Sequence, residues 1–207
     1  MNYKGKLISV EGLEGVGKST VMSTIQAWST DHLEDPIITR EPGGTEISEK
    51  IRDILISHHD DALAGKTELL LMFAARAQLF EQRIQPALEQ GRWVITDRFV
   101  DASYAYQGGG RQIDLRTIKH LHRFVLNDFE ADLTLLLDAS MSVSKKRMVN
   151  RSLDRIESET EAFFHRVRQT YLDLAKQFPD RYRIINAELP KEEVRKQVVA
   201  ELERFIL

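Results

Sequence analysis

The stretch Gly12-Leu13-Glu14-Gly15-Val16-Gly17-Lys18-Ser19 follows a short apolar run, Leu7–Val10, and opens a helical pattern over Lys18–Thr30. It matches G-x-x-x-x-G-K-[ST], a loop whose backbone N–H groups surround phosphate oxygens. The positive N-terminal end of the following helix adds to the attraction for phosphate. The predicted nucleotide-binding residues are Gly12, Leu13, Glu14, Gly15, Val16, Gly17, Lys18, Ser19 and Thr20. Within this set we expect Lys18 to reach the β- and γ-phosphates and Ser19 to place its hydroxyl on Mg²⁺.

Apolar runs alternate with helical patterns along the rest of the chain. The predicted strands are Leu7–Val10, Ile37–Thr39, Trp93–Thr96, Leu133–Asp138 and Tyr182–Ile185. The predicted helices include Lys18–Thr30, Ile47–Leu55, Glu68–Gln90 with Thr67 as its N-cap, Ile118–Leu126, Phe164–Phe178 and Val194–Phe205. Strands that alternate with helices predict an α/β fold with a parallel sheet, in which ligands bind at the carboxyl ends of the strands. We interpret the glycine cluster Gly108–Gly110 as a loop and the charged stretch Lys145–Glu161 as a mobile flap.

The composition narrows the possible functions. A chain of 207 residues that is 42% hydrophobic and 29% charged suits one soluble domain with a full-sized core. Its net charge of −3 disfavours a nucleic-acid partner, and the absence of cysteine excludes disulfides and thiolate chemistry. No apolar run is long enough for a membrane span, and Met1–Lys6 is not followed by a signal-peptide pattern, so we expect a cytoplasmic protein without a membrane partner. The histidines fit no metal motif and are interpreted as surface residues.

Three segments indicate a second, phosphate-accepting ligand. Asp97 and Arg98 end a predicted strand, where a carboxylate can hold Mg²⁺ and a guanidinium can bridge two phosphates; a strand-end ion pair is the alternative. Arg76 lies in an apolar helical stripe, so its charge needs either a ligand base or, if the side chain reaches the surface, water. Tyr104–Gln107 suit a sugar and a base, although such residues are common on surfaces. A GTPase is disfavoured because the chain has no N-K-x-D motif.

These segments resemble those of bacterial thymidylate kinases over essentially the whole chain. The matching stretches are EGLEGVGKST (11–20), TREPGG (39–44), LLMFAARAQL (70–79), DRFVDASYAYQGGGR (97–111) and LDRIE (153–157). The resemblance implies a three-layer P-loop nucleoside-monophosphate-kinase fold, with a five-stranded parallel sheet of order 2-3-1-4-5 and helices on both faces. It also implies a single domain over residues 1–207 with a mobile lid at about 145–160, a homodimer, and transfer of the γ-phosphoryl group of ATP to dTMP with Mg²⁺.

The resemblance also implies a role for each site residue. Glu11 lies near the sugar 3′-hydroxyl and the metal and is catalytic together with Lys18 and Arg98, and Asp97 holds the metal with Ser19. The implied acceptor-binding residues are Glu41, Pro42, Met72, Phe73, Arg76, Arg98, Ser103, Tyr106 and Gln107. Within this set Arg76 hydrogen-bonds thymine, Tyr106 crowds the 2′ position, and either Met72 or Phe73 packs on the base.

The family divides by the position of its extra phosphate-binding arginine, which lies either in the phosphate loop or on the lid. This chain has the acidic Glu14 in the loop and Arg147, Arg151 and Arg155 in the lid stretch, and so resembles the lid-arginine type. If that stretch is helical, the four-residue spacing places these arginines near one face. Arg151 and Arg155 are therefore expected to be catalytic; the alternative is a solvated basic helix face.

An acceptor phosphate is already ionised at neutral pH, so the expected mechanism needs no protein general base. Catalysis would consist of positioning the two ligands and neutralising charge on the transferring group. Two alternatives remain open from the residues: a kinase for another nucleoside monophosphate, and a nucleotide-dependent switch without an acceptor.

Overall fold

The computed structural model describes residues 3–149 and 152–207. Its centre is a five-stranded parallel sheet of order β2-β3-β1-β4-β5. The strands are β1 (Leu7–Glu11), β2 (Ile37–Arg40), β3 (Val94–Asp97), β4 (Leu133–Asp138) and β5 (Tyr182–Asn186). The predicted strands and their order are confirmed. The central strand β1 is buried along its whole length, which explains the apolar residues on both of its faces, at Leu7, Ile8 and Val10.

Strand register brings the predicted site residues to one edge of the sheet. Val10 of β1 lies opposite Asp97 of β3, and Asp97 lies opposite Arg40 of β2. The pattern continues past the strands, because the backbone N–H of Arg98 donates to the Val10 carbonyl at 3.0 Å and that of Glu41 donates to the Asp97 carbonyl at 2.9 Å. Chain segments far apart in sequence therefore leave the sheet side by side.

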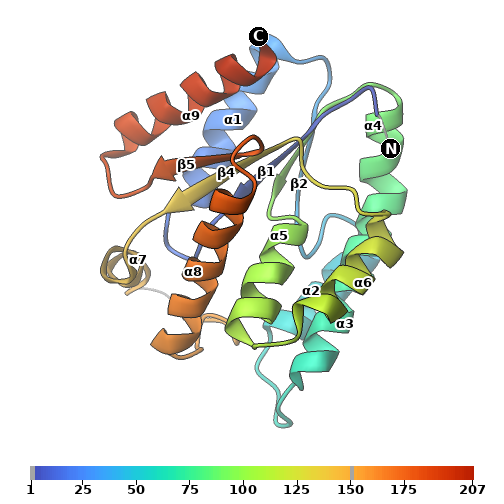
Figure 1. Cartoon of the computed structure of the whole chain (residues 1–207), viewed down its shortest axis with the longest axis vertical. Coiled ribbons are helices and arrows are strands. Elements are labelled where there is room, and N and C mark those ends of the chain that lie inside the picture. The colour runs from blue at the N-terminus through green and yellow to red at the C-terminus, as the bar shows by residue number, and fades with distance from the viewer. Residues whose placement is uncertain (1–2, 150–151) are drawn as a thin grey trace.

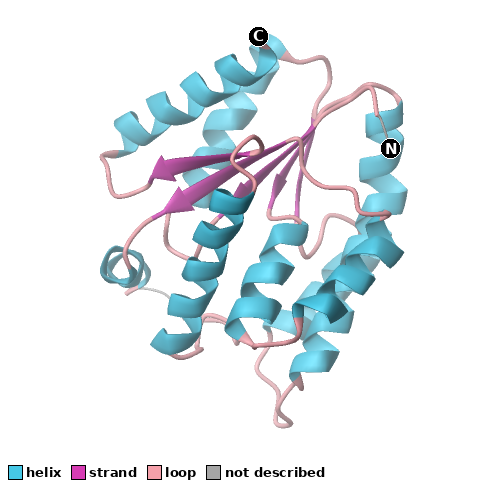
Figure 2. Cartoon of the chain, in the orientation of Figure 1, coloured by secondary structure: helices cyan, strands magenta, loops and turns pink. Residues whose placement is uncertain are grey.

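Helices cover both faces of the sheet. They are α1 (Lys18–His32), α2 (Glu46–Ile56), α3 (Gly65–Leu79), α4 (Gln85–Glu89), α5 (Val100–Ser103), α6 (Leu115–Leu126), α7 (Met141–Met148), α8 (Glu161–Gln177) and α9 (Lys191–Ile206), with π-helical stretches at Phe80–Ile84 and Tyr104–Gly110. Figure 1 shows α1 and α9 together on one side of the sheet, and α3, α5 and α8 on the other. The strands lie between these two helical layers in Figure 2, which confirms the three-layer arrangement. No helix in the described part of the chain is long and apolar enough to cross a membrane.

The helix expected at Glu68–Gln90 is divided into α3, a π-helical stretch and α4. Its start is also earlier than predicted: α3 begins at Gly65, so Thr67 lies inside the first turn and is not the N-cap. Pro86, at the start of α4, has no N–H to donate to the preceding turn. The π-helical stretch Phe80–Ile84 comes directly before it and accommodates this interruption of the helical hydrogen bonds.

The glycine cluster Gly108–Gly110 is not a loop, contrary to the prediction. It ends the π-helical stretch Tyr104–Gly110, which packs along α8. A Cβ atom at Gly109 would lie 2.1 Å from Oγ1 of Thr170, and one at Gly110 would lie 2.4 Å from the ring of Phe163. These glycines therefore allow close packing between helices. A run of three glycines has the same composition in a turn and in such a contact, so the sequence alone does not distinguish the two.

The histidine prediction is wrong for His122, which is buried. Its Nε2 lies 2.9 Å from the carbonyl oxygen of Phe129, and its Nδ1 lies 3.1 Å from the hydroxyl of Tyr104. Position 122 lies four residues after Ile118 and four before Leu126, so it shares the core-facing side of α6 with them.

Candidate active site

The loop between β1 and α1 folds as its motif predicts. Gly12, Gly15 and Gly17 have φ angles of 136°, 74° and 101°, a region that favours glycine, and α1 begins directly after them. The Nζ atom of Lys18 donates to the carbonyl oxygens of Gly12 and Leu13 at 3.1 and 2.9 Å. The lysine is thus folded over the loop, where it can meet the phosphates of a ligand.

A cavity of about 600 Å³, which we call the loop cavity, opens over the phosphate loop. Residues 14–20 form one of its walls, whereas Gly12 and Leu13 are buried and contribute through their carbonyl contacts with Lys18. Side chains of α7 and the β5–α9 connection complete it, including Arg147 and Leu189. Its size suits a nucleotide, since ligand pockets commonly measure ~300–1,000 Å³.

A second cavity of about 80 Å³, the Arg76 cavity, adjoins the first. It is lined by almost all of the predicted acceptor-binding residues, namely Glu41, Pro42, Met72, Arg76, Arg98, Ser103, Tyr106 and Gln107. The residues common to both cavities are Glu14, Glu41, Arg52, Arg98 and Asp154. The two cavities therefore share one wall that carries both acidic and basic groups.

Arg98 lies at this shared wall with its backbone in the left-handed region, at a φ of 72°. Its guanidinium donates to Oε1 of Glu14 at 2.7 Å and to the carbonyl of Gly12 at 2.9 Å. It also donates to the hydroxyl groups of Tyr106 and Tyr171 at 3.0 and 3.2 Å. These contacts fix a permanent positive charge where anions from the two cavities would meet.

The carboxylate of Glu14, which lines the loop cavity, is paired with Arg98. Although burial favours its protonated form, the charges of Arg98 and Lys18 hold the pKa of Glu14 below its usual value. Its carboxylate also accepts a hydrogen bond from the Tyr106 hydroxyl at 2.8 Å. The negative charge of this loop residue is therefore compensated by cationic groups of the protein.

Arg76 is buried and has a partner, which excludes the surface-reaching alternative. The partner is supplied by the protein: Nε donates to Glu41 at 2.7 Å, and the terminal nitrogens donate to the Ser103 hydroxyl at 2.9 Å and to the Phe99 carbonyl at 3.1 Å. Burial raises the pKa of Glu41, and Arg76 opposes that rise. The contacts use three of the five N–H groups of a guanidinium.

The structure separates the roles of Met72 and Phe73. Met72 lines the Arg76 cavity, whereas Phe73 is 2% exposed and lies in the core. The guanidinium carbon of Arg76 lies 4.8 Å from the centroid of the Phe73 ring. Phe73 is therefore not part of the cavity wall, contrary to its inclusion among the substrate-binding residues, because one step along a helix turns a side chain through roughly 100°.

Asp97 and Ser19 both line the loop cavity and fit a Mg²⁺ ion. Atom Oδ1 of Asp97 is buried and has no hydrogen-bond partner within the described structure, so it is an oxygen that needs one. No group of three or more His, Asp or Glu side chains in residues 3–149 and 152–207 could hold a metal by itself. This donor set suits Mg²⁺, which commonly binds through few protein oxygens together with substrate phosphates and water.

Glu11 is fully buried behind Arg98, where three protein groups already donate to it. They are the Ser9 hydroxyl and the Phe99 N–H, both at 2.7 Å from Oε1, and the Tyr171 hydroxyl at 2.7 Å from Oε2. Burial raises the pKa of Glu11 to about 7, and the carboxylate of Asp101 acts in the same direction. Both oxygens of Glu11 therefore have protein partners, and its expected position near the sugar and the metal stays a prediction.

Arg147 and Arg155 do not lie on one helix. Helix α7 ends at Met148, and Arg155 lies in a later turn, so the helical spacing on which that prediction depended is wrong. Arg147 lines the loop cavity and donates to the carbonyls of Val16 and Ala187 at 3.3 and 2.9 Å. Arg151 lies outside the described residues.

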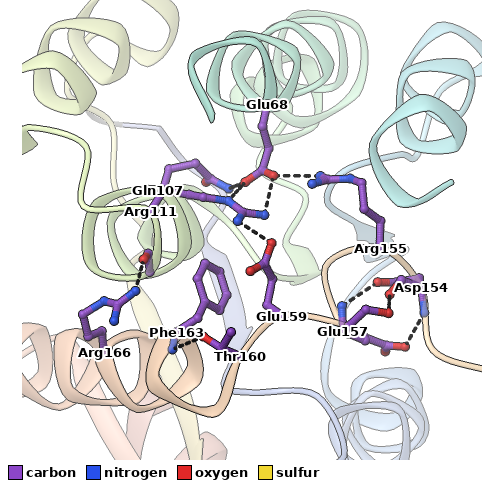
Figure 3. Close-up of polar contacts among 12 residues, drawn as sticks. Glu68, Gln107, Arg111, Asp154, Arg155, Glu157, Glu159, Thr160, Phe163 and Arg166 are labelled. Carbon is purple, nitrogen blue, oxygen red and sulfur yellow. Dashed lines mark hydrogen bonds and ion pairs between the residues drawn. The ribbon is translucent and has the colours of Figure 1, made fainter. Parts of the chain in front are cut away.

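Arg155 is not among the residues that line the loop cavity, and its side chain is bound elsewhere. Its Nη2 atom donates to Glu68 at 2.7 Å, and its Nε atom donates to the carbonyl of Leu55 at 2.8 Å. In Figure 3 the Arg155 side chain extends toward Glu68 on α3. A direct contact with ATP would require this side chain to leave these partners.

Arg52 was missed by the sequence reasoning although it lines both cavities. It lies on α2, and its guanidinium donates to the carbonyl of Pro42 at 2.9 Å. Its place in the sequence could have indicated this role, because Arg52 lies on the helix that directly follows the TREPGG turn. Arg52 lies four residues after the buried Ser48 and three before the buried Leu55, so it is on the inward side of α2.

The fold and the site together define a phosphotransferase of the P-loop nucleoside-monophosphate-kinase class. A phosphate loop of the required geometry borders one cavity, and a second cavity meets it at an arginine. A P-loop switch without an acceptor does not account for the second cavity.

Comparisons with known proteins identify the group within this class. Residues 10–198 match the family described as thymidylate kinase. The chain is 47% identical over 196 residues to a thymidylate kinase of Ruthia magnifica subsp. Calyptogena magnifica, a match that covers 94% of this chain and 96% of that one. It is 44% identical over 203 residues to a thymidylate kinase of Nitrosomonas eutropha, with 98% and 94% coverage.

A solved structure agrees with this grouping. The crystal structure of a thymidylate kinase from Ehrlichia chaffeensis superposes with a TM-score of 0.78 at 30% identity, covering 96% of this chain and 98% of that one. The chain therefore belongs to the thymidylate kinase family, ATP-dependent phosphotransferases that act on dTMP. The alternative of a kinase for another monophosphate is not favoured.

Proposed function

We propose that the chain transfers the γ-phosphoryl group of ATP to dTMP, with ATP in the loop cavity and dTMP in the Arg76 cavity. The observation that carries this assignment is the wall common to both cavities, on which Arg98 is fixed by four protein partners. A phosphate from either side would reach this guanidinium, so the donor and acceptor groups would meet there.

In this mechanism no protein base removes a proton, since the attacking oxygen of dTMP is already ionised. Lys18 and Arg98 bind and orient the phosphates and neutralise charge that develops on the transferring group. Ser19 and Asp97 would hold Mg²⁺, which supplies further charge neutralisation when it is bound with the nucleotide. Without a ligand, the carboxylate of Glu14 forms an ion pair with Arg98. A bound phosphate would compete with Glu14 for the Arg98 guanidinium.

In the acceptor site, Gln107, Ser103 and the remaining N–H groups of Arg76 would hydrogen-bond the thymine base, with Met72 packed on its ring. Tyr106 is 5% exposed and held through its hydroxyl, so its ring can act as a rigid wall at the 2′ position of the sugar. Replacing Tyr106 by Ala should therefore relax the preference for a deoxyribonucleotide, whereas Phe should keep it.

The decisive experiment is ATP–Mg²⁺ turnover measured with a panel of nucleoside monophosphates. The proposal expects dTMP to be the preferred acceptor and expects folded Lys18→Ala protein to lose transfer. A different preferred monophosphate would reassign the Arg76 cavity, and full activity of Lys18→Ala would remove the loop from the donor site.

We also propose how the chain is divided into a domain and a lid. Residues 1–207 would act as one domain, with a mobile lid at about 145–160 whose arginines close over ATP. Alanine at Arg151 or Arg155 should lower kcat far more than it weakens dTMP binding. Near-wild-type kcat in both variants would place the compensating charge elsewhere, with Arg147 as the next residue to test.

We further propose a homodimer in the cytoplasm. Large apolar side chains are exposed on the neighbouring helices α2, α3 and α6, which lie side by side in Figure 1; they are Ile47, Ile54, Leu70, Leu115 and Phe124. Large exposed apolar side chains on adjacent helices commonly mark an interface between subunits. Sedimentation of wild-type and Phe124→Ser protein tests it, since the variant should shift toward monomer.

A further inference from the structure

Glu68 is a buried carboxylate to which the mechanism above assigns no role. It lies in the first turn of α3 and its side chain is 1% exposed. Both oxygens are saturated: Oε1 accepts from Gln107 at 2.9 Å and from Nε of Arg111 at 3.2 Å, and Oε2 accepts from Arg111 and Arg155 at 2.9 and 2.7 Å. A buried anion with four donors is held in a single geometry.

One of these donors belongs to the acceptor site. The amide nitrogen of Gln107 is bound to Glu68, so the amide plane of Gln107 and the direction of its oxygen are fixed by this contact. Gln107 is 1% exposed and lines the Arg76 cavity. An unrestrained amide group can rotate so that its oxygen and nitrogen exchange places. A nucleotide that hydrogen-bonds Gln107 therefore binds better when another group fixes the orientation of this amide.

The other donors are Arg155, which belongs to the base of the lid, defined here as residues 152–160, and Arg111, which contacts that segment. Arg155 binds Glu68 with its side chain, and its backbone N–H donates to the carbonyl of Ile56 at 3.0 Å. Arg111 also donates to Glu159, so Glu68 is linked to a second point of the lid base. Figure 3 shows Glu68 between Gln107 and Arg111 on one side and Arg155 on the other.

The charges of this group are balanced. Burial alone would raise the pKa of Glu68, but the hydrogen bonds from Arg111 and Gln107 and the charge of Arg111 hold the pKa of this carboxyl below its usual value. The two guanidinium groups face two carboxylates, Glu68 and Glu159, and neither arginine is left without an anion. Replacing Glu68 by Gln leaves Arg155 without its carboxylate. It also puts an NH₂ donor in place of one of the two oxygens, which now accept only from Gln107, Arg111 and Arg155, so the geometry of this group cannot be kept.

We infer that Glu68 is a positioning residue that sets the orientation of Gln107 in the acceptor site and, through Arg155, the position of the lid base. This inference rests on the proposed function, since it takes the Arg76 cavity as the dTMP site. It assigns one carboxylate to two parts of the reaction: recognition of the acceptor and placement of the segment that carries the lid arginines.

The test compares Glu68→Gln with Asp138→Asn. Asp138 forms another arginine–carboxylate pair, with Arg168 at 2.7 and 2.8 Å, and neither residue is among those that line the two cavities. We expect Glu68→Gln to raise KM for dTMP and the Kd for dTMP about tenfold, the loss of one hydrogen bond to a charged group. It should also lower kcat, while KM for ATP changes less than about twofold. Asp138→Asn should leave KM for dTMP unchanged.

A double-mutant cycle separates positioning from a general loss of stability. In a Gln107→Ala background, Glu68→Gln should no longer raise KM for dTMP, because the group that it orients is gone. Should Glu68→Gln fail to fold, Glu68→Asp keeps the charge but withdraws it from its partners, and the same increase in KM is expected on a smaller scale. An unchanged dTMP affinity in folded Glu68 variants, or the same increase with and without Gln107, overturns the inference.

The outcome is also distinct from failure of the proposed function. If dTMP is not the acceptor, the wild-type protein does not phosphorylate dTMP with ATP, and calorimetry detects no binding of dTMP to it. If only the inference fails, wild-type protein is active and binds dTMP, and the Glu68 variants bind it equally well.

Discussion

Atom Nε of Arg76 lies 2.7 Å from Oε2 of Glu41, and both side chains are 3% exposed. The two residues come from α3 and from the turn after β2, so this pair joins two walls of the Arg76 cavity. A buried ion pair contributes little net stability compared with an apolar pair, but the loss of one partner leaves the other charge unpaired.

Arg76→Ala should therefore destabilise the protein by about 3–5 kcal/mol, in addition to any effect on dTMP binding. Urea unfolding of Arg76→Ala measures this loss. Unfolding of Arg76→Met, of Glu41→Met and of the double variant that carries both changes tests whether the two residues are coupled. The double variant should be more stable than the sum of the single losses predicts. Additive losses would show that the pair is not coupled.

The Arg76→Ala variant should also respond to pH. The pKa of Glu41 is raised by burial, and Arg76 opposes the rise, so without Arg76 the folded state holds the Glu41 proton more tightly. The folded state then binds more protons than the unfolded chain above the ordinary pKa of glutamate, and stability falls as pH rises. The cost of Arg76→Ala should be smaller at pH 5 than at pH 8; a pH-independent cost contradicts this assignment.

Met72 and Phe73 form a natural pair of test and control. Met72→Ala removes an apolar group from the wall of the Arg76 cavity and should raise KM for dTMP by roughly tenfold, given about 1.5–3 kcal/mol for a fully buried methionine. Phe73→Ala should instead destabilise the fold by about 3–5 kcal/mol, because it empties a core position. Calorimetric binding and urea unfolding of both variants distinguish these effects, and the reverse pattern would mean that Phe73 contacts the base.

Lys18 predicts a pH dependence of ATP use. Burial lowers the pKa of its ammonium group to about 8, and the like charge of Arg98 acts in the same direction. In the free enzyme the lysine then loses its proton as pH rises through about 8, so kcat/KM for ATP should fall there. Bound phosphates favour the charged form, so kcat at saturating ATP should stay level over the same range. A flat kcat/KM between pH 7 and 9 would show that the lysine remains charged.

Gly109 tests the packing of the π-helical stretch on α8. A Cβ atom there would lie 2.1 Å from Oγ1 of Thr170 and 3.0 Å from the carbonyl of Arg166, so Gly109→Ala should cost about 1–3 kcal/mol and displace Gln107. At Gly65 the nearest atoms are 3.9 and 4.0 Å away, so Gly65→Ala should be neutral or gain up to about 1 kcal/mol. Thermal unfolding of the two variants checks this difference; equal stabilities would refute the close contact.

The sheet could be predicted because each strand carries its own signal. Leu133–Asp138 is a near-continuous apolar run, as expected for a strand covered on both faces, and its bounds agree with the structure. The phosphate loop was equally clear, since its glycines, lysine and serine are consecutive in sequence. Local patterns of this kind do not depend on contacts with distant segments.

Pairings between distant residues could not be predicted in the same way. The need of Arg76 for a partner was visible from its apolar neighbours, but Glu41 is 35 positions away and nothing local links the two. Glu68 was overlooked for the same reason, because its partners lie 39 to 87 positions later. Helix boundaries also depended on long-range packing, as the glycines facing α8 show.

The wall common to the loop cavity and the Arg76 cavity has a thermodynamic consequence. Because Glu14, Arg98 and Arg52 border both spaces, a ligand in one of them changes the partners that the other offers. Binding free energies are state functions, so the factor by which ATP alters the affinity for dTMP must equal the factor by which dTMP alters the affinity for ATP. A compound that fills only one space therefore has no single affinity: its potency depends on the concentration of the partner nucleotide.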